Sequence, residues 1–296
     1  MYLVYGASGF LGSALANELS QDSKVVAVVR KTSDTWRLAK NENLQVVKSE
    51  ESEWPSLIPK LKPKIVICAQ WAGVESTDRN DSKIQDQNVA AIIKIAEVAA
   101  QEKCEKFVSL GSQAETSESE ELIPEVFLSD GSSSYGQAKS RLAISLHALL
   151  EESQTEFIWP RIFSIYGPLE TRDGLLPSLL KSMMDSKSFR IREPSKLWSF
   201  LYIDDFVRAF KLIIESNLSH PVVNIGNSQL TTILEICKTV DKEFQFLTDI
   251  ESQDRKGFFP SLEQLEKLDW APRIELSEGC EISIASIRQR LSVKVP

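Results

Sequence analysis

Short, nearly continuous apolar runs alternate with amphipathic stretches over the first half of the chain. The runs are rich in β-branched residues, which is typical of parallel strands covered on both faces. They lie at residues 2–5, 25–29, 44–47, 65–69 and 106–110. Helical periodicity marks residues 11–20, 54–61, 87–101 and 135–152. Strand followed by helix, repeated, predicts an α/β fold with a doubly wound parallel sheet, which a strand at 155–163 extends.

The pattern loosens after Tyr166-Gly167-Pro168. We predict a helix at 175–184, a strand at 197–203, a helix at 206–215 capped by Asp204 or Asp205, a strand at 222–225, and helices at 233–244 and 262–268. Two domains therefore fit the chain. Residues 1–165 form the larger one, and residues 166–296 form a smaller α/β domain, of which the part around 197–226 returns to the main sheet.

Composition narrows the class of protein. Of 296 residues, 42% are hydrophobic and 26% charged, as in a globular protein, and the net charge of −8 offers no basic field for nucleic acid. No apolar stretch approaches the length of a membrane span, and no secretory signal is evident at the N-terminus. The four cysteines lie far apart and there are two histidines, so we expect no metal site. These features together predict a cytoplasmic location.

A glycine-rich turn stands between the first strand and the first helix. Gly6, Gly9 and Gly12 recur at every third position, with Ser8, Phe10 and Leu11 between them. Such a turn lets the backbone approach a pyrophosphate closely, and the helix N-terminus beyond it offers free N–H groups. A strand before and a helix after are the context in which this motif binds a dinucleotide. The alternative is a turn with a purely structural role.

The end of the second strand bears on which dinucleotide binds. An acidic residue about 20 residues past the glycines would hold the ribose 2′-hydroxyl of NAD. The chain instead has Arg30, Lys31, Thr32 and Ser33, with Arg37 beyond. Cations and hydroxyls attract a 2′-phosphate, so the sequence favours NADPH/NADP over NAD. The alternative is that Arg30 and Lys31 are only a solvated strand end.

A tyrosine and a lysine lie on one face of a predicted helix. Tyr135 and Lys139 are four residues apart, and a nearby cation lowers the pKa of a phenol so that it can exchange protons near neutrality. Ser112 follows the fifth strand, where ligands meet the carboxyl edge of a parallel sheet. Ser112, Tyr135 and Lys139 are therefore the candidate catalytic residues.

With these residues in these positions, the chain resembles the extended short-chain dehydrogenase/reductases of the NAD-dependent epimerase/dehydratase family. The matching pieces are the glycine turn, Asn88 at the head of a helix, Ser112, Tyr135 with Lys139, and the stretches 161–168, 202–205 and 224–226. The resemblance implies a Rossmann-type domain that binds NAD(P), a C-terminal domain that binds a nucleotide sugar, and a homodimer. It implies Ser112, Tyr135 and Lys139 as the catalytic set. Further cofactor contacts implied by it are Ala69, Asn88, Tyr135, Lys139, Arg161 and Phe163.

Three stretches are similar to the bacterial 4-keto-6-deoxyhexose reductases of that family. They are residues 70–74, 111–115 and 198–205. Those enzymes make deoxysugars on a nucleotide carrier, as in lipopolysaccharide O-antigen biosynthesis. This chain departs from them in having Thr116-Ser117 in place of Tyr-Gly, and Ser199 in place of Asp. The departures bear on which sugar is used.

The residues after Ser112 favour one reaction. A dehydratase of this family needs Asp-Glu there, whereas this chain has Gln113-Ala114. Epimerisation beside the ketone would need a Cys–His pair, and Cys104, His147 and His220 fall outside the expected site loops. NADPH-dependent reduction of the C4 ketone of a nucleotide-linked 4-keto-6-deoxyhexose remains, with Tyr135 as proton donor. The alternatives are a 4-epimerase that retains NAD and a non-catalytic NADP(H)-binding regulatory protein.

The tryptophans and one acidic stretch are further candidates for substrate contacts, packing or a surface loop. Trp71 and Trp198, with Ser112, Gln113 and Tyr135, are candidate substrate contacts. Trp36, Trp54 and Trp270 are expected to be packing residues rather than platforms for a cofactor. The acidic stretch 115–125 and the serine-rich residues after it predict a solvated loop, or alternatively a lid over the sugar.

Overall fold

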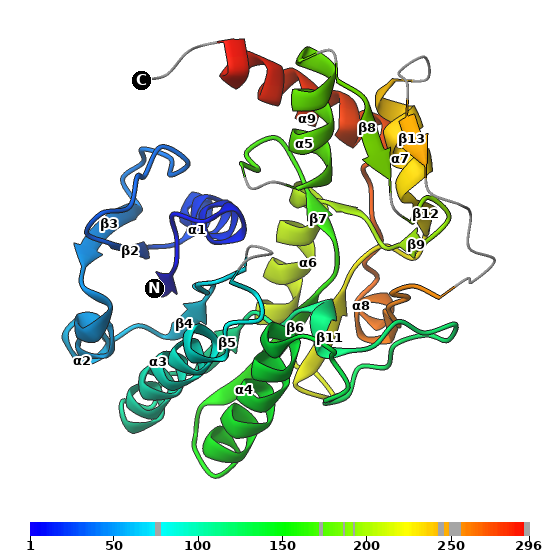
Figure 1. The fold of residues 1–296 in the computed structure, drawn as a ribbon. Helices are drawn as coiled ribbons and strands as arrows, with labels where there is room; N and C mark the ends of the chain where they lie inside the picture. The colour runs from blue at the N-terminus through cyan, green and yellow to red at the C-terminus, as the bar shows by residue number, and fades with distance from the viewer. Residues whose placement is uncertain are drawn as a thin grey trace. The chain divides into compact units, whose positions relative to one another are not determined.

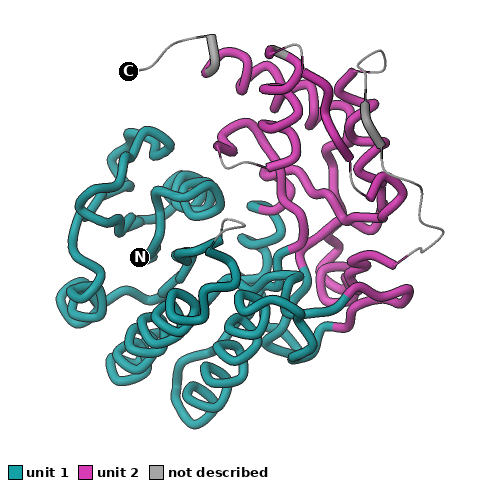
Figure 2. The backbone as a smooth tube through the Cα atoms, in the orientation of Figure 1, with its two compact units in different colours: residues 1–117, 125–162, 207–224 teal, residues 118–124, 163–206, 225–296 magenta. Residues whose placement is uncertain are grey.

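The computed structural model describes residues 1–74, 78–171, 174–185, 187–191, 193–241, 246–248 and 256–292. The chain divides into two compact units (Figure 2). Unit 1 comprises Met1–Ser117, Glu125–Ile162 and Val207–Asn224, and unit 2 comprises Glu118–Pro124, Phe163–Phe206 and Ile225–Pro296. Each unit is thus assembled from separate stretches of chain, whereas the sequence suggested one boundary after residue 165, with the part around 197–226 returning to the main sheet.

Unit 1 is built on a seven-stranded sheet, shown with its helices in Figure 1. The strand order is β11-β6-β5-β4-β1-β2-β3. The strands are β1 (Tyr2–Tyr5), β2 (Val25–Arg30), β3 (Leu44–Ser49), β4 (Ile65–Cys68), β5 (Lys106–Ser109), β6 (Glu156–Ile162) and β11 (Val222–Ile225). The pairs from β3 through β6 are parallel, and Val25–Val29 are buried throughout. The doubly wound parallel sheet is confirmed.

The helices of this unit are α1 (Phe10–Asp22), α2 (Leu57–Leu61), α3 (Ser82–Gln101) and α4 (Ser134–Glu151), with 3₁₀ turns η1 (Glu51–Ser56) and η2 (Gln113–Glu115). Two predicted boundaries were wrong. Helix α3 begins at Ser82 rather than residue 87, because the Asp81 carboxylate caps it by accepting the N–H groups of Lys83 and Ile84. The predicted helix 54–61 is split into η1 and α2, and Pro55, which lacks an amide hydrogen, lies in η1.

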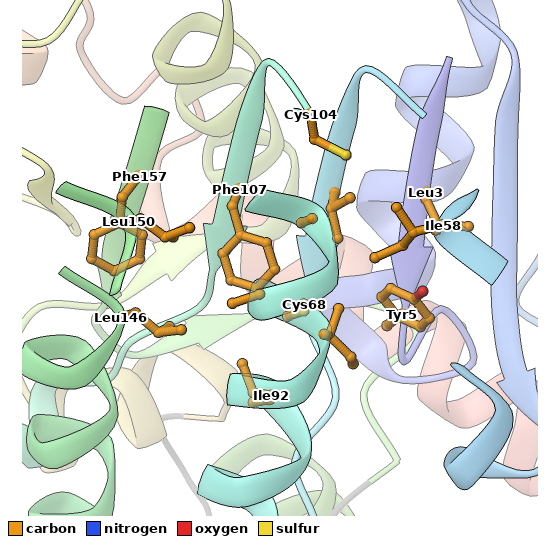
Figure 3. Close-up of a cluster of buried hydrophobic side chains, with 14 of the residues drawn as sticks. Leu3, Tyr5, Ile58, Cys68, Ile92, Cys104, Phe107, Leu146, Leu150 and Phe157 are labelled. Atoms are coloured by element: carbon orange, nitrogen blue, oxygen red, sulfur yellow. The ribbon is translucent and has the colours of Figure 1, made fainter. Parts of the chain in front are cut away.

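A continuous apolar core forms between one face of the sheet and the helices that cover it (Figure 3). Leu3, Phe107 and Trp159 from the strands are fully buried, and Ile92 of α3 and Leu146 of α4 pack against them in the same cluster. Burying side chains of this size contributes about 1.5–3 kcal/mol each. The core therefore holds the carboxyl ends of β1, β4 and β5 rigidly at one edge of the sheet.

Unit 2 contains short paired strands and helices. They are β7 (Ile165–Tyr166), α5 (Leu175–Met184), β8 (Phe189–Ile191), β9 (Leu197–Trp198), β10 (Leu201–Tyr202), β12 (Thr231–Thr232), α7 (Ile233–Val240), β13 (Phe246–Thr248), α8 (Glu263–Lys267) and α9 (Leu276–Ser292). Strand β10 pairs with β7, β12 with β9, and β13 with β8. Helix α6 (Ile203–Glu215) starts in this unit and continues in unit 1.

Several predictions for this half of the chain need correction. The strand expected at 197–203 is the two strands β9 and β10, and Ile203 already begins α6, so Asp204 and Asp205 lie in its first turn rather than at its cap. The Asp205 carboxylate accepts the N–H groups of Arg273 and Ile274. The helix expected at 233–244 ends at Val240, and residue 244 lies outside the described residues. Helix α9 was not predicted.

The acidic segment 115–125 is not a solvated loop along its whole length. Within unit 2, Ser119 forms an antiparallel bridge with Gly257, and the buried Ile123 forms a parallel bridge with Pro260. Lys196 pairs with Glu118 and with Glu193. At its start, in unit 1, Glu115 is fully buried.

As far as the chain is described, no helix combines the length and the apolar character that crossing a membrane requires.

Candidate active site

The fold itself requires two glycines of the glycine-rich turn. Gly6 has φ +74°, and a Cβ on it would lie 2.5 Å from the backbone nitrogen of Gln70, beyond the end of β4. A Cβ on Gly12 would lie 2.4 Å from the Gly6 carbonyl oxygen. These two glycines let the turn, the neighbouring strand and α1 come into direct backbone contact.

Gly9 is different. It is exposed, has φ −75°, and a Cβ on it would meet nothing nearer than the Gly6 oxygen at 3.4 Å, an ordinary contact. It caps α1 without a side-chain hydrogen bond, and no acidic residue lies in the first turn, where Phe10 is buried and Leu11 half-buried. The chain leaves room at Gly9 and free N–H groups beside it, which fits the pyrophosphate of a dinucleotide.

The cations expected at the end of β2 are exposed and close to carboxylates. Arg30 pairs with Glu51 at 3.9 Å and Lys31 with Glu50 at 3.3 Å, and more than half of each of these side chains is accessible. Ser33 follows them, and its carbonyl accepts a hydrogen bond from Lys48. A ligand phosphate at this strand end would therefore meet two cations that are already partly compensated.

Arg37 approaches the glycine turn directly. Its Nη1 donates to the carbonyl oxygen of Ser8 at 3.1 Å, and its guanidinium lies 4.3 Å from the centre of the Trp36 ring. Trp36 is 46% exposed and packs against Arg37, whereas Trp54 and Trp270 are buried. Arg37 thus adds a third cation beside the turn, held in place by a backbone hydrogen bond.

Ser112 is fixed at the start of η2. Its Oγ accepts the N–H of Ala114 at 3.2 Å, and the Glu115 carboxylate accepts the N–H of Ser112 at 2.6 Å. This reciprocal pair is a capping box, which fixes a turn at both of its ends. Gln113, the first residue of η2, is half-buried.

Tyr135 and Lys139 lie in the first turns of α4, whose Ser133 cap accepts the N–H of Gly136. Both side chains are buried, with 9% and 4% of their surface exposed. A Cβ on Gly136 would lie 1.9 Å from the Ala114 carbonyl oxygen. The glycine after Tyr135 therefore allows η2, with Ser112, to rest against the start of α4. The structure brings together the two sequence motifs that carry Ser112 and the Tyr135–Lys139 pair, and Gly136 was the signal that sequence reasoning missed.

The ammonium group of Lys139 is held from several sides. Its Nζ donates to the Leu110 carbonyl at 2.6 Å and lies 3.6 Å from the centre of the Trp71 ring. Burial lowers the pKa of Lys139 to about 7, while the charges of Glu115 and Cys68 oppose the shift. A lysine with this pKa changes its protonation state close to neutral pH.

Trp71 lies in the loop that follows β4, and Asn88 of α3 binds this loop. Trp71 donates its Nε1–H to Gln85 at 2.8 Å and meets Tyr135 edge-on, with ring centres 5.8 Å apart. Asn88 lies in the second turn of α3, not at its head, and its side chain forms hydrogen bonds of 2.9 Å with both the N–H and the C=O of Ala72. The Asn88 side chain thus fixes the loop that contains Trp71, a structural role that the sequence did not predict.

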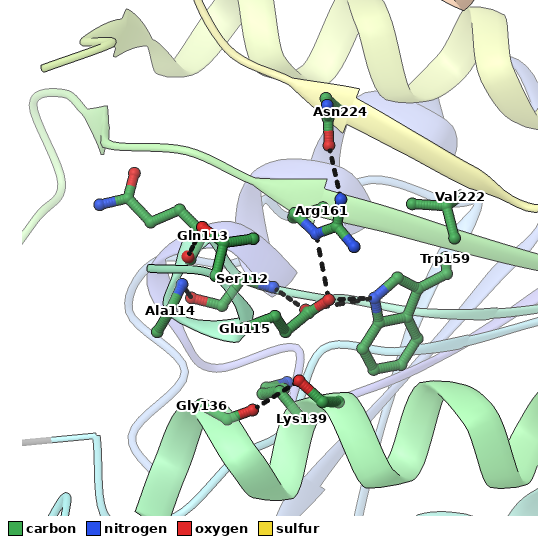
Figure 4. A network of polar contacts seen from close by, with 12 residues as sticks. Ser112, Gln113, Ala114, Glu115, Gly136, Lys139, Trp159, Arg161, Val222 and Asn224 are labelled. Atoms are coloured by element: carbon green, nitrogen blue, oxygen red, sulfur yellow. Dashed lines mark hydrogen bonds and ion pairs between the residues drawn. The ribbon is translucent and has the colours of Figure 1, made fainter. Parts of the chain in front are cut away.

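Glu115 lies at the centre of a buried polar network (Figure 4). Its carboxylate accepts hydrogen bonds from Trp159 Nε1 and from Arg161 Nε, the latter at 3.1 Å. Arg161 also donates to Asn224 Oδ1 and to the carbonyl of Val126. Arg161 is 0% exposed, and its guanidinium donates to these groups, while its expected contact with the cofactor stays a prediction. It is the counter-ion of Glu115.

Two further expected cofactor contacts lie at strand ends. Ala69 directly follows β4, donates its N–H to Tyr5 and lies against the glycine turn, where its carbonyl carbon would be 2.8 Å from a Cβ on Gly6. Phe163 directly follows β6, has 1% of its surface exposed and donates its N–H to the Ile225 carbonyl. The side chain of Phe163 is therefore part of the interior.

In unit 2, Trp198 belongs to a small aromatic group. Its ring centre lies 5.4 Å from that of Phe258 and 6.4 Å from that of Phe200, and the Lys196 ammonium lies 5.2 Å away. The buried Nε1 of Trp198 has no hydrogen-bond partner within the described part of the chain. Ser199 Oγ accepts the Asn227 N–H at 2.6 Å and donates to its carbonyl at 2.9 Å. The serine that replaces the expected aspartate thus has a structural task of its own.

Comparison with known proteins assigns the family. The model of the NAD dependent epimerase/dehydratase family matches residues 2–226, most of the chain. The chain belongs to this family and is an NAD(P)-dependent enzyme. The resemblance noted from the glycine turn, Ser112, Tyr135 and Lys139 is confirmed.

Individual relatives are distant. The chain is 24% identical to dTDP-4-dehydro-6-deoxyglucose reductase of Escherichia coli, over 97% of both proteins, and 22% identical to UDP-glucuronate 4-epimerase of Thermodesulfobacterium geofontis, over 96% of this chain and 94% of that protein. Among solved structures, UDP-glucose 4-epimerase of Thermotoga maritima superposes with a TM-score of 0.83 at 21% identity, covering 98% of this chain and 99% of that one. UDP-glucuronic acid 4-epimerase of Bacillus cereus, solved with NAD, gives 0.82 at 22%, covering 97% and 98%. At these identities the structural likeness establishes the fold.

Proposed function

We propose that this protein uses NADPH to reduce the C4 ketone of a nucleotide-linked 4-keto-6-deoxyhexose. One observation carries the proposal: the turn that begins at Ser112 rests against the start of the helix that carries the buried Tyr135 and Lys139, and Ser112 is followed by Gln113-Ala114. An amide and a methyl group cannot serve as the acid and base that dehydration requires. The relative from Escherichia coli, whose name describes reduction of such a sugar, supports the choice.

Each catalytic side chain has a role that its surroundings support. The bound nicotinamide supplies the hydride. Tyr135 protonates the oxygen at C4 as negative charge develops on it, and the Lys139 ammonium lowers the pKa of the phenol. Ser112 donates a hydrogen bond to the same oxygen, with Oγ orientation fixed by the Ala114 N–H. Trp71 and Gln113 contact the substrate, and the expected substrate contact of Trp198 stays a prediction from the sequence.

The cofactor is held by the glycine turn and the cations beside it. Gly9 and the free N–H groups of α1 hold the pyrophosphate, and Ser8, Phe10, Leu11 and Ala69 line the turn. Arg30, Lys31 and Arg37, with the Ser33 hydroxyl, hold the 2′-phosphate of NADPH. Lys139 and Tyr135 hold the nicotinamide ribose. Asn88 acts through its hydrogen bond with the Ala72 backbone, and Arg161 acts through its ion pair with Glu115.

A second candidate is a 4-epimerase that retains NAD. It is favoured by the solved neighbours, several of which are 4-epimerases in complex with NAD, and by Glu50 and Glu51 beside Lys31 and Arg30.

A non-catalytic NADP(H)-binding protein is a third candidate, which any turnover dependent on Tyr135 would exclude. The homodimer also stays a proposal.

The test uses the purified protein with dTDP-4-dehydro-6-deoxyglucose, and follows loss of reduced cofactor with NADPH and NADH in parallel. We expect consumption that prefers NADPH, and in Tyr135→Phe a rate about 10²–10⁴-fold lower with cofactor binding retained. Tightly held NAD without net consumption, together with interconversion of UDP-glucuronate and its 4-epimer, would favour the epimerase and contradict the reductase.

A further inference from the structure

A buried ion pair lies directly behind the candidate catalytic residues. The side chains of Arg161 and Glu115 have 0% and 1% of their surface exposed. The Glu115 carboxylate accepts N–H groups from its own turn, through Ser112, and from β6, through Trp159 and Arg161. Every one of these partners is a donor, which matches the ionised form of the carboxyl group. Burying such a pair is costly unless it is fully hydrogen-bonded, and this one is.

The same carboxylate lies beside the lysine. Lys139 Nζ donates to the carbonyl of Leu110, and a Cβ on the next residue, Gly111, would lie 2.7 Å from Glu115 Oε1. Lys139 Nζ also lies 5.9 Å from the ring centre of Trp159, whose Nε1 is bound to Glu115. Figure 4 shows Glu115 on the side of η2 that faces Lys139 on α4. The Leu110–Gly111 backbone and the Trp159 ring are therefore neighbours of both charged groups.

We propose that Glu115 is a positioning residue of the catalytic site: it fixes the turn that carries Ser112, and it supplies the buried negative charge that the Lys139 ammonium faces. The identity of the catalytic residues in this statement rests on the proposed function. The electrostatic part concerns the lysine alone and is tested separately from turnover.

The groups that face Lys139 come from four elements. They are Tyr135 on α4, Cys68 on β4, Trp71 after β4, and Glu115 on η2, with Arg161 of β6 behind Glu115. Burial acts against the ammonium, and the charges of Glu115 and Cys68 favour it. The Cys68 thiol is itself neutral near pH 7, because burial raises its pKa to about 12. Glu115 is therefore the negative charge that supports the Lys139 ammonium at neutral pH.

The direct test is a titration of Lys139 in protein labelled with ¹³C at the lysine ε-carbon, with the Lys139 signal identified by its loss in Lys139→Met. In Glu115→Gln, which keeps the shape and removes the charge, we expect the midpoint to fall by about one pH unit or more, because a neighbouring opposite charge shifts a pKa by about 1–3 units. Glu115→Asp, which keeps the charge, should stay nearer the wild type. Glu121→Gln makes the same chemical change at an exposed position and should leave the midpoint unchanged. An unchanged midpoint in Glu115→Gln would overturn the proposal.

A second variant guards against misfolding, because Glu115→Gln leaves Arg161 as an uncompensated buried cation. The double variant Glu115→Gln/Arg161→Gln removes both charges, and it too should show the lowered Lys139 midpoint. Where substrate turns over, the pH profile of kcat should move with that midpoint in both variants, while Glu121→Gln keeps the wild-type profile. If wild-type protein reduces no 4-keto sugar, the proposed reaction fails, and the titration still decides the role of Glu115.

Discussion

The carbonyl oxygen of Ala114 lies so close to the backbone of Gly136 that a Cβ there would be 1.9 Å from it. This contact joins the turn that carries Ser112 to the helix that carries Tyr135 and Lys139. Tyr135 directly precedes Gly136, Lys139 follows it by three residues, and Ser112 precedes Ala114 by two, so a small displacement of η2 from α4 changes the distances between these side chains.

Gly136→Ala therefore tests how the site is assembled. Alanine in place of glycine stabilises an open helix by about 1 kcal/mol, but here the added methyl group must push η2 away. We expect a kcat about 10²-fold lower, as for a misplacement of about 1 Å, with NADPH binding largely kept. Gln137→Ala, at the next and exposed position, is the control. A Gly136→Ala protein that is more stable and fully active would contradict this picture.

Replacing Gly9 or Gly12 of the glycine turn by alanine should affect different properties, cofactor binding in one case and stability in the other. Gly9→Ala should fold normally and bind NADPH at least tenfold more weakly, because the added methyl group occupies space that the chain itself leaves free. Gly12→Ala should lose thermal stability, because its methyl group would overlap the Gly6 carbonyl. Thermal unfolding and fluorescence titration with NADPH separate the two effects. Equal loss of stability in both variants would show that Gly9 too is structural.

Burial of Lys139 predicts a pH dependence of stability. Its pKa is about 7 in the folded protein against 10.5 for an ordinary lysine. Between these values the unfolded chain holds one more proton, so this residue makes the protein more stable as pH rises, by up to about 1.4 kcal/mol per unit. Below pH 7 the lysine is protonated in both the folded and the unfolded protein, so the free-energy cost of burying its ammonium is present in full.

The measurement is urea unfolding of wild type and Lys139→Met between pH 7 and 8.5. The wild type should gain about 1 kcal/mol per pH unit relative to the variant. Taking the difference between the two proteins removes the contributions of the buried cysteines, which are the same in both. A difference that does not vary with pH would mean that Lys139 keeps an ordinary pKa.

The cations at the end of β2 predict the cofactor preference. Arg30→Ala with Lys31→Ala should weaken NADPH binding by about tenfold or more and leave NADH binding unchanged, because NADH has no 2′-phosphate. Glu51→Gln, which removes the carboxylate paired with Arg30, should tighten NADPH binding slightly. Lys83→Ala, on the exposed surface of α3, is the control. Equal weakening of both cofactors would contradict the assigned role.

Local patterns in the sequence predicted the sheet, which the structure confirms, and they also suggest Ser112, Tyr135 and Lys139 as catalytic residues, which stays a prediction. Runs such as Val25–Val29 are apolar and β-branched, and the Tyr135–Lys139 spacing defines one helix face. The sequence did not predict the role of Glu115, because an acidic residue at the head of an acidic stretch has the pattern of a solvated loop. Its burial depends on Arg161, 46 residues further along the chain. The exposed Trp36 and the division of the chain into units likewise depend on tertiary contacts that no local pattern encodes.

The central claim is that hydride passes from NADPH to C4 of the sugar. The most direct measurement uses NADPH deuterated at C4 of the nicotinamide, in both stereochemical forms, with dTDP-4-dehydro-6-deoxyglucose, and locates deuterium in the product by NMR. The account predicts one equivalent of deuterium at C4 of the hexose from one of the two forms, and the same labelled product formed about 10²–10⁴-fold more slowly with Tyr135→Phe. Product that forms without deuterium at C4, or conversion of a nucleotide sugar without consumption of NADPH, would contradict it.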